Sequence, residues 1–193
     1  FCSEPVPLEA PLRRLRLRRG SLIDDPPDDV EALHLERMRA ALPHLDPGTC
    51  FARSSAALVH GLPLFSADLD RVHILRTRGG HGSRNGVSHG YRTPQVPPDA
   101  QVVDGFPVTS LARTAGDLMR RTLFGPALAV ADTALRLGCD RERLLAEVEK
   151  GRGCRHSTEA ARRADPRGES PYESLVRAQI LQAGLPLPVL QHE

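Results

Sequence analysis

Aromatic residues, lysine and long apolar runs are scarce in this sequence. Its 193 residues include no tryptophan, two tyrosines and five phenylalanines, and Lys150 is the one lysine. No stretch comes near the roughly 18 to 20 consecutive apolar residues that a membrane-spanning helix needs, and no basic segment followed by an apolar one marks a secretory signal. We therefore expect a protein without a membrane partner, whose core is built mostly from leucine, valine and alanine.

Cysteine is also sparse, and its spacing excludes two classes of small domain. The four cysteines, at positions 2, 50, 139 and 154, form no C-x-x-C pair. This spacing fits neither a dense disulfide framework nor a zinc knuckle. We expect reduced thiols in a cytoplasmic protein. A zinc site from Cys139, Cys154 and His156 is the weaker alternative, because no second ligand lies beside Cys139.

The charge balance is close to neutral, but its basic part is almost entirely arginine. The 26 basic and 24 acidic side chains give a formal net charge of +2. A GC-rich genome explains a general excess of arginine over lysine, whereas a local concentration needs another cause. Arginine binds phosphate through a planar, permanently charged fork. DNA contact is therefore predicted, with a solvated strand face as the alternative, for five arginines within seven residues: Arg13, Arg14, Arg16, Arg18 and Arg19.

Hydrophobic periodicity and turn residues predict an α+β fold that is mostly helical after residue 109. Leucine and arginine alternate over residues 14–18, as in a half-buried hairpin strand. Further strands are predicted over 71–77, 86–92 and, on both sides of the Asp104–Gly105 turn, 101–108. Helices are predicted over 30–42, 54–60, 111–119, 123–137 and 141–149, with a short one capped by Ser157 and a last one that starts at Ser170.

The last predicted helix begins with a recognisable capping pattern. Ser170, Pro171 and Glu173 form an S-x-x-E box with proline at the first helical position. In such a box, the serine and glutamate side chains bind main-chain N–H groups at the start of the helix. Glu173 is therefore predicted to cap the helix. Its other possible role depends on the resemblance described next.

Three stretches, in this order, resemble an actinobacterial protein family: RSSAALVHGLPL (53–64), DGFPVTSLARTAGDLMR (104–120) and ESPYESLVRAQILQAGLPLPVLQHE (169–193). The family has a winged-helix amino-terminal region, a middle region similar to the AbiEi antitoxin, and a carboxy-terminal domain similar to the Vsr endonucleases of the PD-(D/E)XK fold. The resemblance implies three regions. Residues 1–29 would be a wing remnant and linker, 30–164 an AbiEi-antitoxin-like mixed and helical region, and 165–193 the start of a restriction-endonuclease-like domain.

The resemblance also implies a chain truncated at both ends. The recognition helix of the winged helix would precede the arginine segment, and the strands that carry most of the nuclease active site would follow residue 193. Glu173 matches the family's helix glutamate, so it would be a catalytic and metal-binding residue. Such a site holds a divalent cation, Mg²⁺, only when the domain is complete. We therefore expect this chain by itself not to cut DNA.

Two function hypotheses follow from the resemblance and the arginine segment. The first is a cytoplasmic DNA-binding protein of a bacterial defence or toxin–antitoxin system, related to proteins with a Vsr-like endonuclease domain. The second is a non-catalytic antitoxin and autoregulator that binds operator DNA and a cognate toxin. A module without a nucleic-acid role is a third, weaker hypothesis.

The histidines and one arginine–aspartate pair favour structural roles. His60, His73 and His89 have no nucleophile beside them in a known catalytic motif. Arg113 and Asp117, one helical turn apart, predict a surface ion pair.

Overall fold

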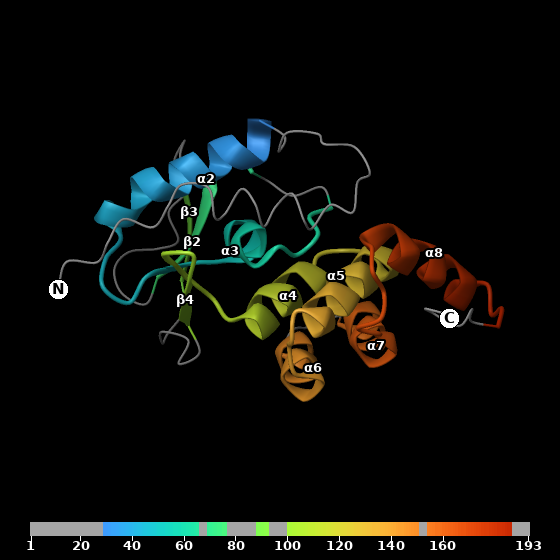
Figure 1. The fold of residues 1–193 in the computed structure, drawn as a ribbon. Coiled ribbons are helices and arrows are strands. Elements are labelled where there is room, and N and C mark those ends of the chain that lie inside the picture. Colours follow the sequence, from blue (N-terminus) through green and yellow to red (C-terminus); the bar gives the residue numbers. More distant parts are fainter. Residues whose placement is uncertain (1–28, 66–68, 77–87, 93–99, 151–153, 187–193) are drawn as a thin grey trace. The chain divides into compact units, whose positions relative to one another are not determined.

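The computed structural model describes residues 29–65, 69–76, 88–92, 100–150 and 154–186. The described elements and their bounds are α2 (Asp29–Ala41), η1 (Leu42–His44), β1 (Cys50–Phe51), α3 (Arg53–His60), β2 (Val72–Arg76), β3 (Ser88–Arg92), β4 (Gln101–Val103), β5 (Phe106–Val108), α4 (Leu111–Met119), α5 (Phe124–Arg136), α6 (Arg141–Glu149), α7 (Arg155–Arg163) and α8 (Pro171–Gln182). The fold is α+β, as the sequence predicts (Figure 1).

The chain divides into two compact units. Unit 1 comprises residues 1–61 and 66–110, and unit 2 comprises residues 62–65 and 111–193. The predicted boundary at 164/165 lies within unit 2, and the assignment of the residues after it to a nuclease-like domain stays a prediction. Within the described residues, none of the helices has the length and apolar character that crossing a membrane requires.

Unit 1 is built on a mixed five-stranded sheet with the strand order β3-β2-β1-β5-β4. Its outermost pairs differ: β2 and β3 run parallel, whereas β4 and β5 are antiparallel. At the centre, β1 pairs antiparallel with β2 and parallel with β5. Helices α2 and α3 contact β2, and α3 also contacts β5. The two-residue strand β1 and the parallel pairings were not predicted from the sequence.

Turn residues set two chain reversals in unit 1. Asp104 and Gly105 both have positive φ, 49° and 80°, as a two-residue hairpin turn between β4 and β5 requires. The register that pairs Val103 with Phe106 confirms the predicted turn. Helix α3 ends where Gly61 adopts the left-handed conformation, with φ 72°, and its N–H binds the carbonyls of Ala57 and Leu58.

Unit 2 is a helical bundle centred on α5 (Figure 1). Residues 127–134 of α5 are all buried, because α4, α7 and α8 pack around this helix. The packing is close in places. A Cβ at Gly116 in α4 would come within 3.0 Å of the Glu147 Cβ in α6, and one at Gly125 within 3.3 Å of Leu175 in α8. Small residues therefore set the distances between these helices.

One predicted helix start is wrong. The sequence places Ser157 at the cap of its helix, but the capping residue of α7 is Cys154, three residues earlier, and the helix begins at Arg155. Ser157 is buried within the first turn, and its Oγ donates a 2.9 Å hydrogen bond to the carbonyl of Cys154. A serine inside a helix often bonds to the carbonyl of the preceding turn, so a serine alone did not identify the cap.

Candidate functional site

The predicted site residues fall in different parts of the chain. Arg13, Arg14, Arg16, Arg18 and Arg19 lie outside the described residues. Glu173 lies in the first turn of α8 and is exposed. No predicted residue set is therefore brought together by the described structure.

Ser170 caps α8 as predicted, and the Glu173 side chain reaches back to the chain before the helix, but it binds the N–H of Glu169 rather than that of the capping residue Ser170. The Glu173 N–H donates to the Oγ of Ser170 at 3.1 Å, and the Glu173 Oε2 accepts the N–H of Glu169 at 3.0 Å. The predicted capping role is confirmed. The predicted catalytic and metal-binding role of Glu173 stays a prediction.

The described residues do not form a metal site around Glu173. Within the described part of the chain, no three His, Cys, Asp or Glu side chains are grouped so that they could hold a metal ion, and one Glu173 carboxylate oxygen already binds a main-chain N–H. A divalent cation needs several oxygen ligands from one site. Cys139, Cys154 and His156, which are all described, are not grouped as the ligands of a zinc ion either. Burial raises the pKa of the Cys139 thiol to about 11, so this thiol is protonated at neutral pH and is not a reactive thiolate.

Unit 1 contains a buried serine–histidine pair that resembles the start of a catalytic dyad. The His34 Nδ1 lies 2.7 Å from the Leu69 carbonyl, so it carries the ring proton. The His34 Nε2 then accepts a hydrogen bond from the Ser55 Oγ, at 2.9 Å. This is the geometry in which a histidine base activates a hydroxyl.

The environment of this pair excludes a nucleophilic role. His34 and Ser55 are both 0% exposed, so no substrate reaches the hydroxyl in this conformation. The Ser55 Oγ also accepts the N–H of His73, at 2.8 Å. Each of these polar atoms has a hydrogen-bond partner, as buried polar groups in native proteins do. The pair therefore ties α2 and α3 to β2.

The network continues to an aromatic pair on the sheet. The His73 Nδ1 lies 2.8 Å from the Tyr91 hydroxyl, and the two rings are stacked with their centroids 5.6 Å apart. The Arg53 guanidinium carbon lies 3.5 Å from the centroid of the Tyr91 ring, a cation–π contact. Arg53 also has a positive φ of 52°, which is uncommon for a residue with a side chain.

His60 has a buried structural role. It lies in the last turn of α3, where the sequence interpretation placed it, and its Nε2 lies 2.7 Å from the Thr109 carbonyl. This hydrogen bond connects the end of α3 to the residue that follows β5. His60 is 7% exposed, so its role is in packing rather than at the surface.

Unit 2 buries a full ion pair. The Arg177 Nη2 in α8 lies 2.6 and 2.7 Å from the two carboxylate oxygens of Asp132 in α5. The side chains are 5% and 1% exposed. Asp132 also accepts the Asp165 N–H at 2.7 Å. Burial raises the pKa of Asp132, although its contacts with Ser174, the Asp165 N–H and Arg177 act in the opposite direction.

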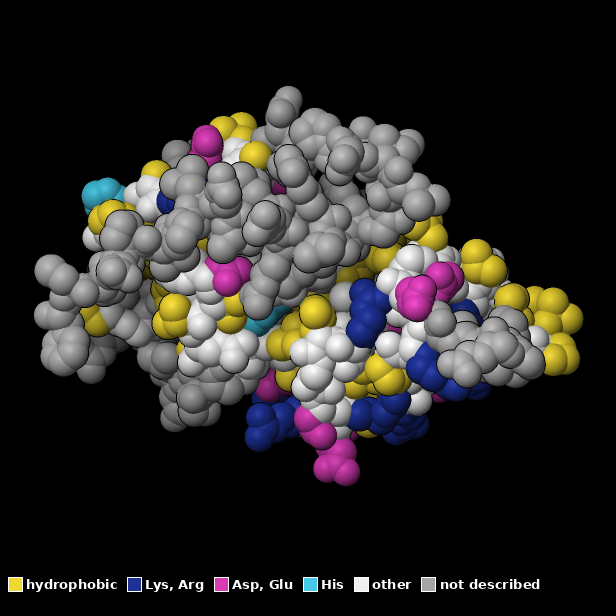
Figure 2. All heavy atoms as spheres, in the orientation of Figure 1, with side chains coloured by type: hydrophobic (Ala, Val, Ile, Leu, Met, Phe, Trp, Pro, Cys, Tyr) yellow, Lys and Arg dark blue, Asp and Glu magenta, His cyan; other side chains and the backbone are white. Residues whose placement is uncertain are grey.

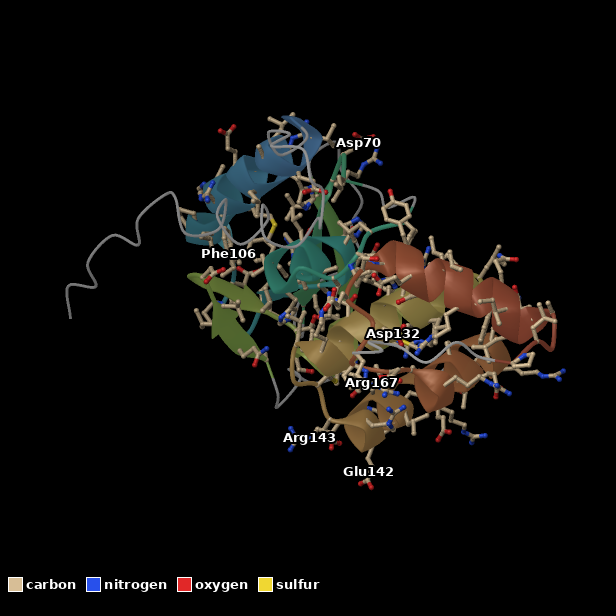
Figure 3. The ribbon with its side chains drawn as sticks, turned by 45° about the vertical axis from the view of Figure 1, so that its right-hand side comes forward. Asp70, Phe106, Asp132, Glu142, Arg143 and Arg167 are labelled. Carbon is tan, nitrogen blue, oxygen red and sulfur yellow. The ribbon has the colours of Figure 1, made fainter. Side chains whose placement is uncertain are left out.

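The segment between α7 and α8 is tied to this pair. The Arg177 Nη1 lies 3.9 Å from the Asp165 carboxylate, and hydrogen bonds from Arg167 hold the pKa of Asp165 at about 2. Figure 3 labels Asp132 on α5 and Arg167 on this segment. Arg136 donates to the carbonyls of Gly168 and Glu169. The sequence contains a signal for this pair: Asp132 is the one carboxylate of α5 and follows a run of apolar residues, 127–131.

Arg113 and Asp117 form the predicted ion pair. Their side chains meet at 3.0 Å, and the exposed fractions are 28% and 12%. Asp117 also pairs with Arg120, which in turn donates to the carbonyl of Glu147 in α6. The pair therefore belongs to a junction between α4 and α6 and is less exposed than a pure surface pair.

Comparisons with known proteins give relatives but no function. Two uncharacterized proteins of Mycobacterium tuberculosis, MT2308 (strain CDC 1551 / Oshkosh) and Rv2248 (strain ATCC 25618), are each 40% identical to this chain over 97 residues, which make up 48% of this chain. The chain spans only 35% of the length of these curated relatives. No protein-family profile matches the chain. No solved structure shows significant similarity to it.

Proposed function

We propose that this chain is the DNA-binding part of a bacterial defence or toxin–antitoxin protein that acts in the cytoplasm. The observation that carries the proposal is the segment with Arg13, Arg14, Arg16, Arg18 and Arg19, where leucine alternates with arginine. In the strand that the sequence predicts, Arg14, Arg16 and Arg18 would share one face, and guanidinium groups bind the phosphate backbone of DNA. The resemblance to winged-helix, AbiEi-antitoxin-like proteins supports the same proposal.

The salt dependence of DNA binding tests this proposal. Each phosphate contact that is lost reduces the slope of log Kd against log salt by about 0.9 for duplex DNA. We expect the triple variant Arg14→Ala/Arg16→Ala/Arg18→Ala to lower the slope by about two to three. Fluorescence anisotropy with a labelled duplex measures it.

A matched control keeps the change in net charge the same. Arg121→Ala/Arg143→Ala/Lys150→Ala removes three exposed charges from unit 2 and is expected to leave the slope nearly unchanged. If the wild-type chain does not bind duplex DNA at any salt concentration, or if the two triple variants behave alike, the proposal is wrong.

A second candidate function is a non-catalytic antitoxin, with a toxin protein as the partner. The observation that favours it is the hydrogen bonding of Glu173, whose carboxylate caps α8 and has no grouped metal ligands around it among the described residues. Both hypotheses predict no nicking by these 193 residues, so the test uses a longer chain that includes the sequence after residue 193. If that chain does not nick supercoiled DNA in the presence of Mg²⁺, the antitoxin is favoured. Nicking that disappears in Glu173→Gln and persists in Glu169→Gln favours the endonuclease hypothesis.

A further inference from the structure

Helix α7 of unit 2 has a basic outer side. Its buried residues are the small Ser157, Ala160 and Ala161, so the long side chains all point to solvent. Four of the nine residues are basic and exposed: Arg155, His156, Arg162 and Arg163. Figure 2 shows Lys and Arg side chains over the region of α7, whereas over α6 they are mixed with Asp and Glu side chains. We propose that these four residues, the α7 basic face, form a second contact with the phosphates of DNA; this inference rests on the proposed function.

The helix does not need the arginines of its last turn for capping. Arginine near a helix C-terminus often stabilises the last carbonyls. Here two arginines from other elements already bind them. Arg141 in α6 donates to the carbonyls of Ala161, Arg162 and Ala164, and Arg177 in α8 donates to that of Arg163. The side chains of Arg162 and Arg163 are thus left at the surface without a role in closing the helix.

The basic residues of the first turn act against helix stability. The N-terminus of a helix carries the positive end of its dipole, so acidic residues are favourable there and basic ones are unfavourable. Helix α7 has no acidic residue in its first turn, and Arg155 and His156 occupy its first two positions. Glu159, one turn further along α7, offsets part of the Arg155 charge and is shared with Arg162 and Arg163. An anionic partner outside the helix would offset the excess of positive charge.

The ion pairs on this face are exposed and easily exchanged. Arg163 pairs with Glu159, with 50% and 43% of the side chains exposed, and Arg162 lies 3.7 Å from Glu149, with 63% and 52% exposed. Such exposed pairs contribute little to stability. A phosphate group accepts two hydrogen bonds from one guanidinium, so it competes well with these carboxylates.

The spacing of the exposed arginines along α7 matches a row of DNA phosphates. The neighbouring helix α8 does not have such a row. Arg155 and Arg162 are two helical turns apart on one side of α7, about 10 Å along its axis. The phosphates of one DNA strand follow each other at 3.4 Å along the duplex axis, so the face spans about three steps. The neighbouring helix α8 instead exposes uncharged Tyr172 and Val176, at 75% and 61%. An arginine-rich composition alone does not explain why exposed arginines lie on α7, while α8 exposes these uncharged side chains.

The test uses the full chain and the triple variant Arg155→Ala/Arg162→Ala/Arg163→Ala. The three side chains are exposed and alanine favours helix, so the fold is retained, which circular dichroism checks. For a labelled DNA duplex, we expect the slope of log Kd against log salt to fall by about two to three. The matched control is Arg121→Ala/Arg143→Ala/Lys150→Ala, which removes the same charge from other positions of unit 2.

The outcomes separate this inference from the proposed function. A slope that falls in the α7 variant and not in the control supports the α7 basic face. Suppose that the Arg14→Ala/Arg16→Ala/Arg18→Ala variant has a lower slope than the wild type, as the proposed function predicts. If the slope of the α7 variant then equals that of the wild type or of the control, this inference alone is overturned. If the wild-type chain does not bind duplex DNA, both the inference and the proposed function are overturned.

Discussion

The buried polar side chains described in unit 1 include no Asp, Glu, Lys or Arg, whereas those of unit 2 include a full ion pair. In unit 1, the imidazole of His34, the Ser55 hydroxyl and the main-chain groups of Leu69 and His73 bind one another. In unit 2, the buried groups are the carboxylate of Asp132 and the guanidinium of Arg177. A neutral network loses one or two hydrogen bonds when a member is removed, but an ion pair leaves a buried charge. The two units should therefore differ in their tolerance of substitution.

The largest effect is expected from breaking the ion pair in unit 2. Arg177→Met leaves the Asp132 carboxylate buried and without its guanidinium. Breaking a buried pair in this way typically costs about 3–5 kcal/mol, and we expect a loss of that size in the free energy of unfolding of unit 2. Urea unfolding followed by circular dichroism measures it, with the two units analysed as separate transitions if they unfold independently.

Two further variants separate the effect of the buried charge from that of losing an arginine side chain. Arg163→Met removes an arginine from an exposed pair with Glu159, and we expect a loss below about 1 kcal/mol. The double variant Asp132→Asn/Arg177→Met keeps an acceptor for the Asp165 N–H and removes both charges, so it should recover part of the stability. A loss below 1 kcal/mol in Arg177→Met would contradict the ionic description of unit 2.

Local structure could be predicted from the sequence because its signals are local. The helix over 111–119, the turn at Asp104–Gly105 and the capping box at Ser170 depend on neighbouring residues, and the structure confirms all three. Long-range pairing could not be predicted in the same way. Strand β1 has two residues, too few to show a period, and its place in the sheet depends on partners 23 and 57 residues away, Ile74 and Val108.

The candidate site was predicted less completely than the fold. The capping role of Glu173 follows from its spacing to Ser170 and is confirmed, whereas its catalytic role and the DNA contacts of the arginine segment stay predictions. The buried partners of Asp132 lie 33 and 45 residues away in the sequence, so no local pattern identified them. The basic side of α7 was missed because Ser157 was taken as a cap, which moved the predicted start of the helix past Arg155.

A smaller effect is expected in the neutral network of unit 1. Ser55→Ala removes the hydroxyl that donates to the His34 Nε2 and accepts the His73 N–H. Two buried groups then lack a partner, which typically costs about 1–3 kcal/mol. Urea unfolding measures the loss. Faster hydrogen exchange at the His73 amide would locate it in the network.

A serine-to-alanine substitution in unit 2 provides the control. Ser157→Ala removes one hydrogen bond to the Cys154 carbonyl, which also accepts the N–H of Thr158 at 2.8 Å. The carbonyl therefore keeps a partner, and we expect a loss below about 1 kcal/mol. Equal losses in Ser55→Ala and Ser157→Ala would show that the unit 1 network has no special importance for stability.

The smallest effect is expected in the pH response of the segment beside the ion pair in unit 2. Hydrogen bonds from Arg167 hold the pKa of Asp165 at about 2 in the folded chain, below its ordinary value of 3.8. Because the folded pKa is the lower one, the ionised carboxylate favours the folded state. This contribution to the free energy of unfolding is complete above about pH 4 and is lost as the pH falls towards 2.

The substitution Arg167→Gln tests the source of this shift. It should raise the pKa of Asp165 towards 3.8, as carboxyl NMR titration would measure. The control Arg163→Gln should raise the pKa of Glu159 and leave that of Asp165 unchanged. If the pKa of Asp165 stays near 2 in Arg167→Gln, then Arg177, whose Nη1 lies 3.9 Å from this carboxylate, is the main cause of the lowered pKa. The buried ion pair of Asp132 and Arg177 would then also stabilise the ionised carboxylate of Asp165 beside it.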